Sequence, residues 1–216
     1  VLSKGHCAPG LYAVLAERGF FPKEDLETLR HIGSHLQGHP NMNDTPGVDM
    51  STGSLGQGLS VAAGLAAGLR LTGEDGLVFT VLGDGECEEG QVWEAAMFAA
   101  HQKLGRLVAI IDNNELQIDG CIHDVCDPGD LGEKFAAFGW NVIKADGHDF
   151  DSLRAALAAA KAEKGRPSVI LAKTVKGKGV SFMENDPGWH GKAPNAEQYE
   201  QAMTELNAAV EKLEVE

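Results

Sequence analysis

Residues 77–85, LVFTVLGDG, decide the fold of this chain. A mostly apolar run ends in an acidic glycine turn, and a stretch with helical character follows it. A second apolar run, LVAII at residues 107–111, leads into a polar loop that contains Asn114. This order of strand, turn, helix and strand is typical of a βαβ unit with parallel strands. We therefore expect Asp84 and Asn114 to lie side by side at the carboxyl edge of a parallel sheet, where open α/β sheets bind ligands.

The rest of the chain continues the same alternation. Further strands are expected at residues 140–143 and 168–172, separated by an amphipathic helix at 151–163. Strands separated by helices of this length imply right-handed crossovers. The fold class is therefore α/β, with three layers in which a mostly parallel sheet is flanked by helices. Other helices are expected at residues 8–17, 23–31, 56–71, 88–103 and 196–213, and long loops at 33–54 and 174–194.

The helix expected at residues 56–71 differs from the others because it is apolar nearly all round. A helix of this kind is usually buried on all sides. We therefore expect close packing around it.

Composition narrows the class of protein. A chain of 216 residues fits one large domain, and its hydrophobic content of 43% is that of a globular protein. The 32 acidic residues exceed the 18 basic ones, which gives a net charge of −14 without a basic patch and argues against nucleic-acid binding.

Neither a membrane-spanning stretch nor a signal peptide is visible, so we expect a cytoplasmic protein. The four cysteines show no zinc-ribbon spacing, and we expect no disulfide.

The residues at the expected sheet edge favour a cation and a phosphate. Asp84 and Asn114 offer a carboxylate and an amide oxygen, which suit Mg2+ completed by phosphate oxygens and water. Ca2+ or Mn2+ would accept the same ligands. Gly85 stands where a helix begins, so its N–H could face a phosphate oxygen. The alternative is a tight Asp-Gly turn without a ligand, but the strand context and the distance to Asn114 favour the site.

The first long loop carries two further motifs, GHP at residues 38–40 and STGSLGQG at residues 51–58. Their glycines would let the backbone approach a flat ring closely, and the loop leads into a helix N-terminus. The alternative is a flexible linker with a capping serine.

The sequence resembles the N-terminal, diphosphate-binding domain of transketolases. The GDG turn followed by 28 residues and Asn114 resembles the thiamine diphosphate motif. The stretches LSKGH at 2–6, PGVDMSTGSLGQG at 46–58 and WHGK at 189–192 resemble transketolase motifs and occur in the family's order over nearly the whole chain. The resemblance implies a thiamine diphosphate-binding fold, a single domain over residues 1–216, and thiamine diphosphate with Mg2+ as cofactors.

The resemblance also implies roles for individual residues. The catalytic candidates are three histidines in recognisable motifs, although a lone histidine is more often structural. His6 and His190 would lie near the diphosphate and the reacting sugar, and His39 would hydrogen-bond the substrate. The candidates for cofactor binding are His6, Gly53, Leu55, Gly85, Asn114, Ile118, His190 and Lys192, and those for the metal are Asp84, Asn114 and the carbonyl of Leu116.

Two glutamates after the GDG turn have two interpretations. Glu89 and Glu94 match glutamates at the interface between two cofactor sites of the family. Acidic residues are also favourable at any helix N-terminus, so both interpretations remain open.

The activity implied by the resemblance is that of a transketolase of the pentose phosphate pathway, which moves a two-carbon ketol unit from a ketose phosphate to an aldose phosphate. Transketolases also need a glutamate from a pyrimidine-binding domain, and no part of this sequence resembles that domain. We therefore expect a split transketolase, inactive alone, that works with a separate C-terminal subunit in a homo- or hetero-oligomer. The chain begins inside a motif at Val1, so we also expect a missing N-terminal segment and self-association through exposed apolar surface.

Two alternatives remain from the sequence. The chain could be a cofactor-binding module without activity of its own. It could also belong to another thiamine diphosphate enzyme, such as a 2-oxoacid dehydrogenase, as one of its subunits, although the motifs at His39, 51–58 and 189–192 argue against this. A Rossmann dehydrogenase does not fit, because no G-x-G-x-x-G follows an early strand.

Overall fold

The computed structural model describes residues 1–215 and contains one four-stranded parallel sheet. The order of the strands is β1 (Val78–Gly83), β2 (Leu107–Asn113), β6 (Ser168–Lys173) and β5 (Asn141–Asp146). All three strand pairs are parallel, and Gly83 of β1 stands opposite Asp112 of β2. The four strands lie where the apolar runs predicted them, and the α/β class is confirmed.

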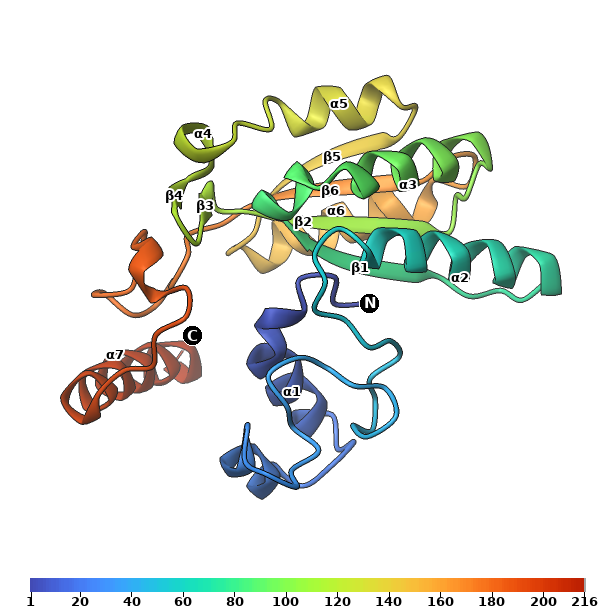
Figure 1. Ribbon diagram of the computed structural model, residues 1–216. Coiled ribbons are helices and arrows are strands. Elements are labelled where there is room, and N and C mark those ends of the chain that lie inside the picture. The colour runs from blue at the N-terminus through green and yellow to red at the C-terminus, as the bar shows by residue number, and fades with distance from the viewer. Residues whose placement is uncertain (216) are drawn as a thin grey trace.

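Helices cover both faces of the sheet, which gives three layers (Figure 1). On one face α2 (Gly58–Thr72), α3 (Gly90–His101) and α5 (Leu131–Ala137) enclose the main core. On the other face α6 (Phe150–Ala162) packs through alanines on the opposite side chains of β2 and β6. Among the largest fully buried side chains of the main core are Trp140, Phe135, Leu107, Ile111 and Val92.

A second, smaller core lies under the first long loop. There α1 (Ala8–Glu17) packs with Phe21, Leu36 and Val48. The helix expected at residues 23–31 is instead a short 3-10 helix, η2 (Lys23–Thr28). It ends early because the segment that follows turns through left-handed backbone conformations at Arg30 and Gly33.

The helix expected at residues 88–103 is present as α3, two residues shorter at each end. A 3-10 turn, η3 (Gly85–Glu88), is followed by Glu89 in an extended conformation and then by α3. The extended residue interrupts the helical hydrogen bonding, so the chain changes direction directly after the GDG turn.

The expectation that the 56–71 helix is buried on all sides is wrong. The outer side of α2 is open, with Leu65 44% and Leu71 83% exposed. Gly64 and Gly68 also face open space, because a Cβ atom at either would meet nothing within 4 Å. The helix packs on β1 and α3 through its inner side only.

The sequence did not anticipate the short elements. After β2 the chain forms a hairpin of β3 (Leu116–Gln117) and β4 (Gly120–Cys121), and the short helix α4 (Ile122–Val125) follows. The 174–194 loop contains the 3-10 turn η4 (Pro187–Trp189), and the chain ends in α7 (Ala196–Val215). The N-terminal residues run beside β1 and continue into the 3-10 turn η1 (Gly5–Cys7).

Two negative expectations concern crosslinks and membranes. The four cysteines are free in the structure. Among residues 1–215 no helix combines the length and the apolar character that crossing a bilayer would require.

Candidate active site

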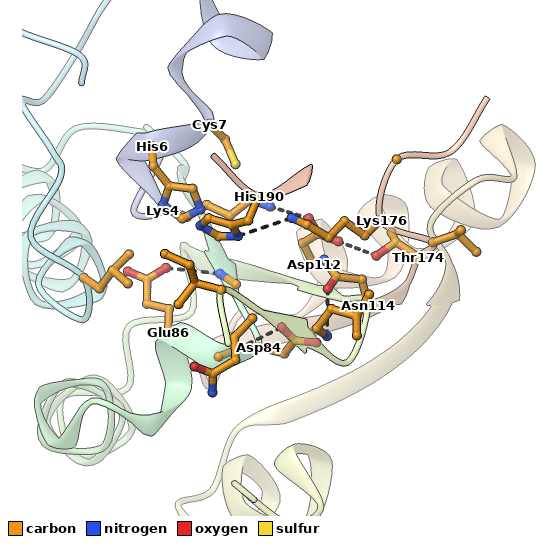
Figure 2. A pocket seen from close by; sticks show the side chains of 18 of the residues that line it. Lys4, His6, Cys7, Asp84, Glu86, Asp112, Asn114, Thr174, Lys176 and His190 are labelled. Carbon is orange, nitrogen blue, oxygen red and sulfur yellow. Dashed lines mark hydrogen bonds and ion pairs between the residues drawn. The ribbon is translucent and has the colours of Figure 1, made fainter. Parts of the chain in front are cut away.

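A cavity of about 490 Å³ opens at the carboxyl ends of β1 and β2 (Figure 2). Its walls come from segments far apart in the sequence: the N-terminal segment, the GDG turn, the loop after β2 and the loop after β6. The N-terminal segment reaches the cavity because Ser3 N–H donates to the carbonyl of Val81 at 2.9 Å, which aligns it with the edge of β1.

Most of the predicted site residues line this cavity, but three do not. His39 and Gly53 contact each other instead, since a Cβ at Gly53 would lie 2.9 Å from the His39 ring. The Nζ atom of Lys192 lies 4.6 Å from the centre of the Trp189 ring. The roles of these three residues remain predictions. The predicted residues that line the cavity are His6, Leu55, Asp84, Gly85, Asn114, Leu116, Ile118 and His190.

Asp84 is a buried carboxylate in the turn after β1. Only 2% of the residue is exposed, and its oxygens accept hydrogen bonds from the backbone N–H groups of Gly85, at 2.8 Å, and Glu115. Burial raises the pKa of Asp84 above its usual value, although these two hydrogen bonds act in the opposite direction. The N–H of Gly85, which we expected to face a phosphate, is directed at Asp84 in this structure.

Asp112 and Lys4 form a second charged pair that the sequence did not reveal. The Lys4 ammonium lies against Asp112, and the hydroxyl of Thr174 donates to the same carboxylate. Burial pushes the pKa of Asp112 upward, but Lys4 and the hydrogen bonds outweigh it, and the pKa lies below its usual value. Burial acts to lower the pKa of Lys4, and Asp112 more than compensates and raises it. Both groups are therefore charged near neutral pH.

The oxygen atoms of Asp84 and the neighbouring cavity residues are suitable ligands for a hard divalent cation. Asp84 supplies a carboxylate, Asn114 an amide oxygen that also accepts from the N–H of Leu116 at 3.0 Å, and the backbone carbonyl of Leu116 is a third oxygen. Mg2+, Ca2+ and Mn2+ prefer such oxygen ligands. Among residues 1–215 there is no cluster of three histidine, cysteine or acidic side chains suited to a metal, so the site depends on this mixed set.

The rest of the cavity fits an anionic group joined to a flat ring. Leu55 and Ile118 line it with 38% and 63% of their surfaces exposed, which leaves apolar area for a ring. Lys4 and Lys176 also line it and bring positive charge to the side on which the histidines lie (Figure 2). Thus one cavity offers cation ligands, ammonium groups and an apolar wall.

Two predicted histidines come together from opposite ends of the chain. The rings of His6 and His190 lie 4.9 Å apart, and Lys176 Nζ is 3.4 Å from Nδ1 of His190. Burial, His190 and nearby lysines lower the pKa of His6 to about 4, and burial with Lys176 and Lys4 lowers that of His190. Both imidazoles are therefore neutral near pH 7 and can donate or accept a proton.

Glu86 also lines the cavity and connects three of the motifs. It is 3% exposed and accepts hydrogen bonds from the N–H groups of Gly56 at 2.9 Å and Gly83 at 3.1 Å, and from the hydroxyl of Ser3. These donors belong to the three motifs LSKGH, STGSLGQG and GDG. One carboxylate thus holds together segments that are far apart in the sequence.

Sequence reasoning missed several residues of the cavity, although some signals were present. Lys4 stands inside the LSKGH motif, and Lys176 belongs to a basic stretch that directly follows β6. His148 was left unassigned, yet its Nε2 accepts from the N–H of Val175 at 2.7 Å and so supports the cavity loop. Glu89 and Glu94 are exposed, so their two interpretations stay open.

Comparisons with known proteins show the family to which the chain belongs. The family described as "Transketolase, thiamine diphosphate binding domain" matches residues 1–215. The chain is 46% identical to a 6-deoxy-6-sulfo-D-fructose transketolase subunit of a Clostridium species, over 95% of this chain and 75% of that subunit. It is 41% identical to one of the subunits of an apulose-4-phosphate transketolase of Phocaeicola vulgatus, over 100% of this chain and 76% of that relative.

A solved transketolase structure has the same fold as this chain. The crystal structure of transketolase from Campylobacter jejuni aligns with a TM-score of 0.89 at 31% identity. The alignment covers 94% of this chain but only 33% of that transketolase. The chain thus spans about a third of a full-length transketolase and about three quarters of the subunits that it matches.

Proposed function

The chain belongs to the transketolase family through its thiamine diphosphate-binding domain, and we propose that it is the N-terminal subunit of a split transketolase. It binds thiamine diphosphate and, with a separate pyrimidine-binding subunit, transfers a two-carbon ketol unit from a ketose to an aldose. The observation that carries this proposal is the convergence of the separate sequence motifs on one cavity at the carboxyl edge of the sheet. The subunit names of its relatives support the partner.

The chain's own residues have distinct tasks in this proposal. Asp84, Asn114 and the Leu116 carbonyl hold Mg2+, and Lys176 neutralises part of the diphosphate charge. Leu55 and Ile118 pack on the rings. The bound cofactor supplies the carbon nucleophile.

The two neutral histidines serve proton transfer. His6 and His190 lie on the side of the cavity opposite Asp84 (Figure 2). We assign to them the acceptance and return of the proton of a sugar hydroxyl, a task for which a neutral imidazole is suited at pH 7.

The names of the relatives suggest the class of sugar. One relative is named for a sulfonated fructose and another for apulose 4-phosphate. Both sugars end in an anionic group, so we propose a ketose with a terminal phosphate or sulfonate as the donor. A panel of xylulose 5-phosphate, apulose 4-phosphate and 6-deoxy-6-sulfofructose would identify it, with pyruvate as the control for a 2-oxoacid enzyme.

Calorimetric titration of thiamine diphosphate into the purified chain, with and without Mg2+, tests the site. We expect binding that depends on the metal. If binding occurs only after a pyrimidine-binding subunit is added, the cavity needs its partner to form. If thiamine diphosphate binds neither to the chain alone nor to the chain with the added subunit, the proposed function is refuted. Ketol transfer by this chain alone would refute the split arrangement.

A further inference from the structure

The C-terminal helix α7 carries an apolar seam with the spacing of a coiled coil. Successive members of the seam lie alternately four and three positions apart in the sequence, which is the spacing of the a and d positions of a heptad repeat. Most of them are open: Tyr199 is 52%, Leu206 40%, Val210 52% and Leu213 71% exposed. The α7 seam consists of Tyr199, Met203, Leu206, Val210 and Leu213.

The rest of the protein holds only the first half of α7. Ala202 is buried, and Glu205 accepts hydrogen bonds from the backbone and the hydroxyl of Ser181, both at 2.6 Å. No other helix or strand of the described residues makes extensive contact with α7, which lies apart from the sheet in Figure 1. The seam at Val210 and Leu213 is therefore left without a partner in the described chain.

The charges around the seam indicate which partner fits. Between Ala196 and Leu213 the helix carries four glutamates and one lysine. Among the described residues Glu200, which flanks the seam, and Glu211 take part in no ion pair. A second copy of the chain, with its net charge of −14, would bring acidic flanks together, and residues flanking the seam decide partner choice in coiled coils.

We infer that the α7 seam docks a helix of the complementary pyrimidine-binding subunit, one with its own apolar seam and with lysine or arginine beside it. This inference rests on the proposed function, because that function supplies the second subunit. Apolar burial would stabilise the contact, and the opposite charges would select the partner and accelerate association.

The seam is connected to the cavity through the loop before α7. That loop, residues 174–194, contributes Lys176 and His190 to the cavity wall and is tied to α7 through Ser181. Docking on α7 would therefore restrict the motion of residues 174–194. Because these residues line the cavity, the chain in complex with its partner should bind thiamine diphosphate more tightly than the isolated chain.

The test uses the full chain and a recombinant pyrimidine-binding subunit of a split transketolase. The variant Val210→Glu/Leu213→Glu places two carboxylates in the seam. The matched control, Thr204→Glu/Ala208→Glu, adds the same charge to the opposite, exposed side of α7. We expect the seam variant to weaken the complex at least about tenfold in Kd, and the control to bind within about twofold of the wild type. The milder pair Val210→Ala/Leu213→Ala, which keeps the helix, should give an intermediate loss.

The outcomes separate this inference from the proposed function. If the two subunits associate and catalyse ketol transfer but the seam variant binds as tightly as the wild type, the docking inference is wrong and the function stands. If sedimentation shows that the wild-type chain dimerises alone and the seam variant does not, the occupant is a second copy and the inference is overturned. If no complex and no activity form at all, both fail.

Discussion

Two aspartates at neighbouring strand ends acquire opposite properties from their surroundings. Asp112 lies against the Lys4 ammonium, and its pKa is lowered. Asp84, which follows the adjacent strand, has mainly backbone donors, and burial raises its pKa. A buried carboxylate without a close counter-charge is stabilised by a bound cation. We therefore propose Asp84 as the carboxylate that binds the metal, whereas Asp112 is already paired with Lys4.

Replacement of Asp84 tests this difference. Asp84→Ala should weaken Mg2+-dependent binding of thiamine diphosphate by at least about a hundredfold, because it removes the only carboxylate of the proposed metal ligands. Titration calorimetry measures the affinity, and a cooperative melting curve shows that the fold is kept. The control is Asp119→Ala, which changes an exposed carboxylate of the next loop. Equal affinity of the Asp84 variant and the wild type would refute the assigned ligand.

The pKa of His6 leads to a prediction on pH. Because its pKa is lowered from 6.5 to about 4, the folded protein favours the neutral ring. The stabilisation is complete above pH 6.5 and is lost as the pH falls from 6.5 toward 4, where the unfolded chain binds the extra proton. In NMR titration the His6 ring should show a midpoint near 4, and His6→Asn should flatten the fall in unfolding free energy between these pH values. A midpoint near 6.5 would contradict the effect of the half-buried pairing with His190.

At the scale of elements, a single side chain joins three segments. Glu86 sits in the turn between β1 and α3 and receives hydrogen bonds from Gly56, Gly83 and Ser3. The N–H of Gly56 is buried and that of Gly83 is partly buried, so both need this acceptor. The contact also aligns the N-terminal segment and the loop before α2 with the GDG turn, which shapes the cavity.

Removal of the Glu86 carboxylate should therefore destabilise the fold. We expect Glu86→Ala to lower the free energy of unfolding by about 2–4 kcal/mol, because buried donors lose their acceptor and a void remains. Urea denaturation measures the change. Glu94→Ala, which alters an exposed glutamate of α3, should stay within about 0.5 kcal/mol of the wild type. A loss no larger than that of this control would mean that Glu86 does not hold the segments together.

At the scale of the whole molecule, one side of the helical layer is open. The exposed side of α2 and α3 carries Leu65, Leu71, Met97 and Phe98, which are 44%, 83%, 56% and 45% exposed. Apolar side chains exposed together on two neighbouring helices can form an interaction surface. This face is separate from the α7 seam, so the molecule presents two apolar surfaces of different form.

The open face predicts that the chain self-associates. Sedimentation velocity should detect dimers or larger species of the wild type, and Leu65→Glu/Phe98→Glu should shift them toward the monomer, because it places charge in the contact. The α7 variant Val210→Glu/Leu213→Glu is the control and should leave this association unchanged. A wild-type chain that remains monomeric at micromolar concentration and melts cooperatively would contradict the prediction.

Much of the fold could be predicted from the sequence because its signals are local. The apolar runs at residues 77–82 and 107–111 predict β1 and β2, and the helix over residues 8–17 lies where it was expected. The short hairpin β3–β4, α4 and α5 escaped prediction because they contain too few residues to show a period. The break between η3 and α3 at Glu89 also has no local signal, since it depends on how the turn packs.

The sequence by itself determined the βαβ order, the family resemblance and eight of the residues that line the cavity, because motifs and hydrophobic runs are properties of neighbouring residues. Only the tertiary structure decided which distant groups meet. It paired Lys4 with Asp112, brought His6 beside His190 and placed Glu86 under three loops. It also left α2 open on one side and, among residues 1–215, the second half of α7 without a packing partner. These features depend on contacts between residues far apart in the chain, and burial and pairing set their charge and exposure.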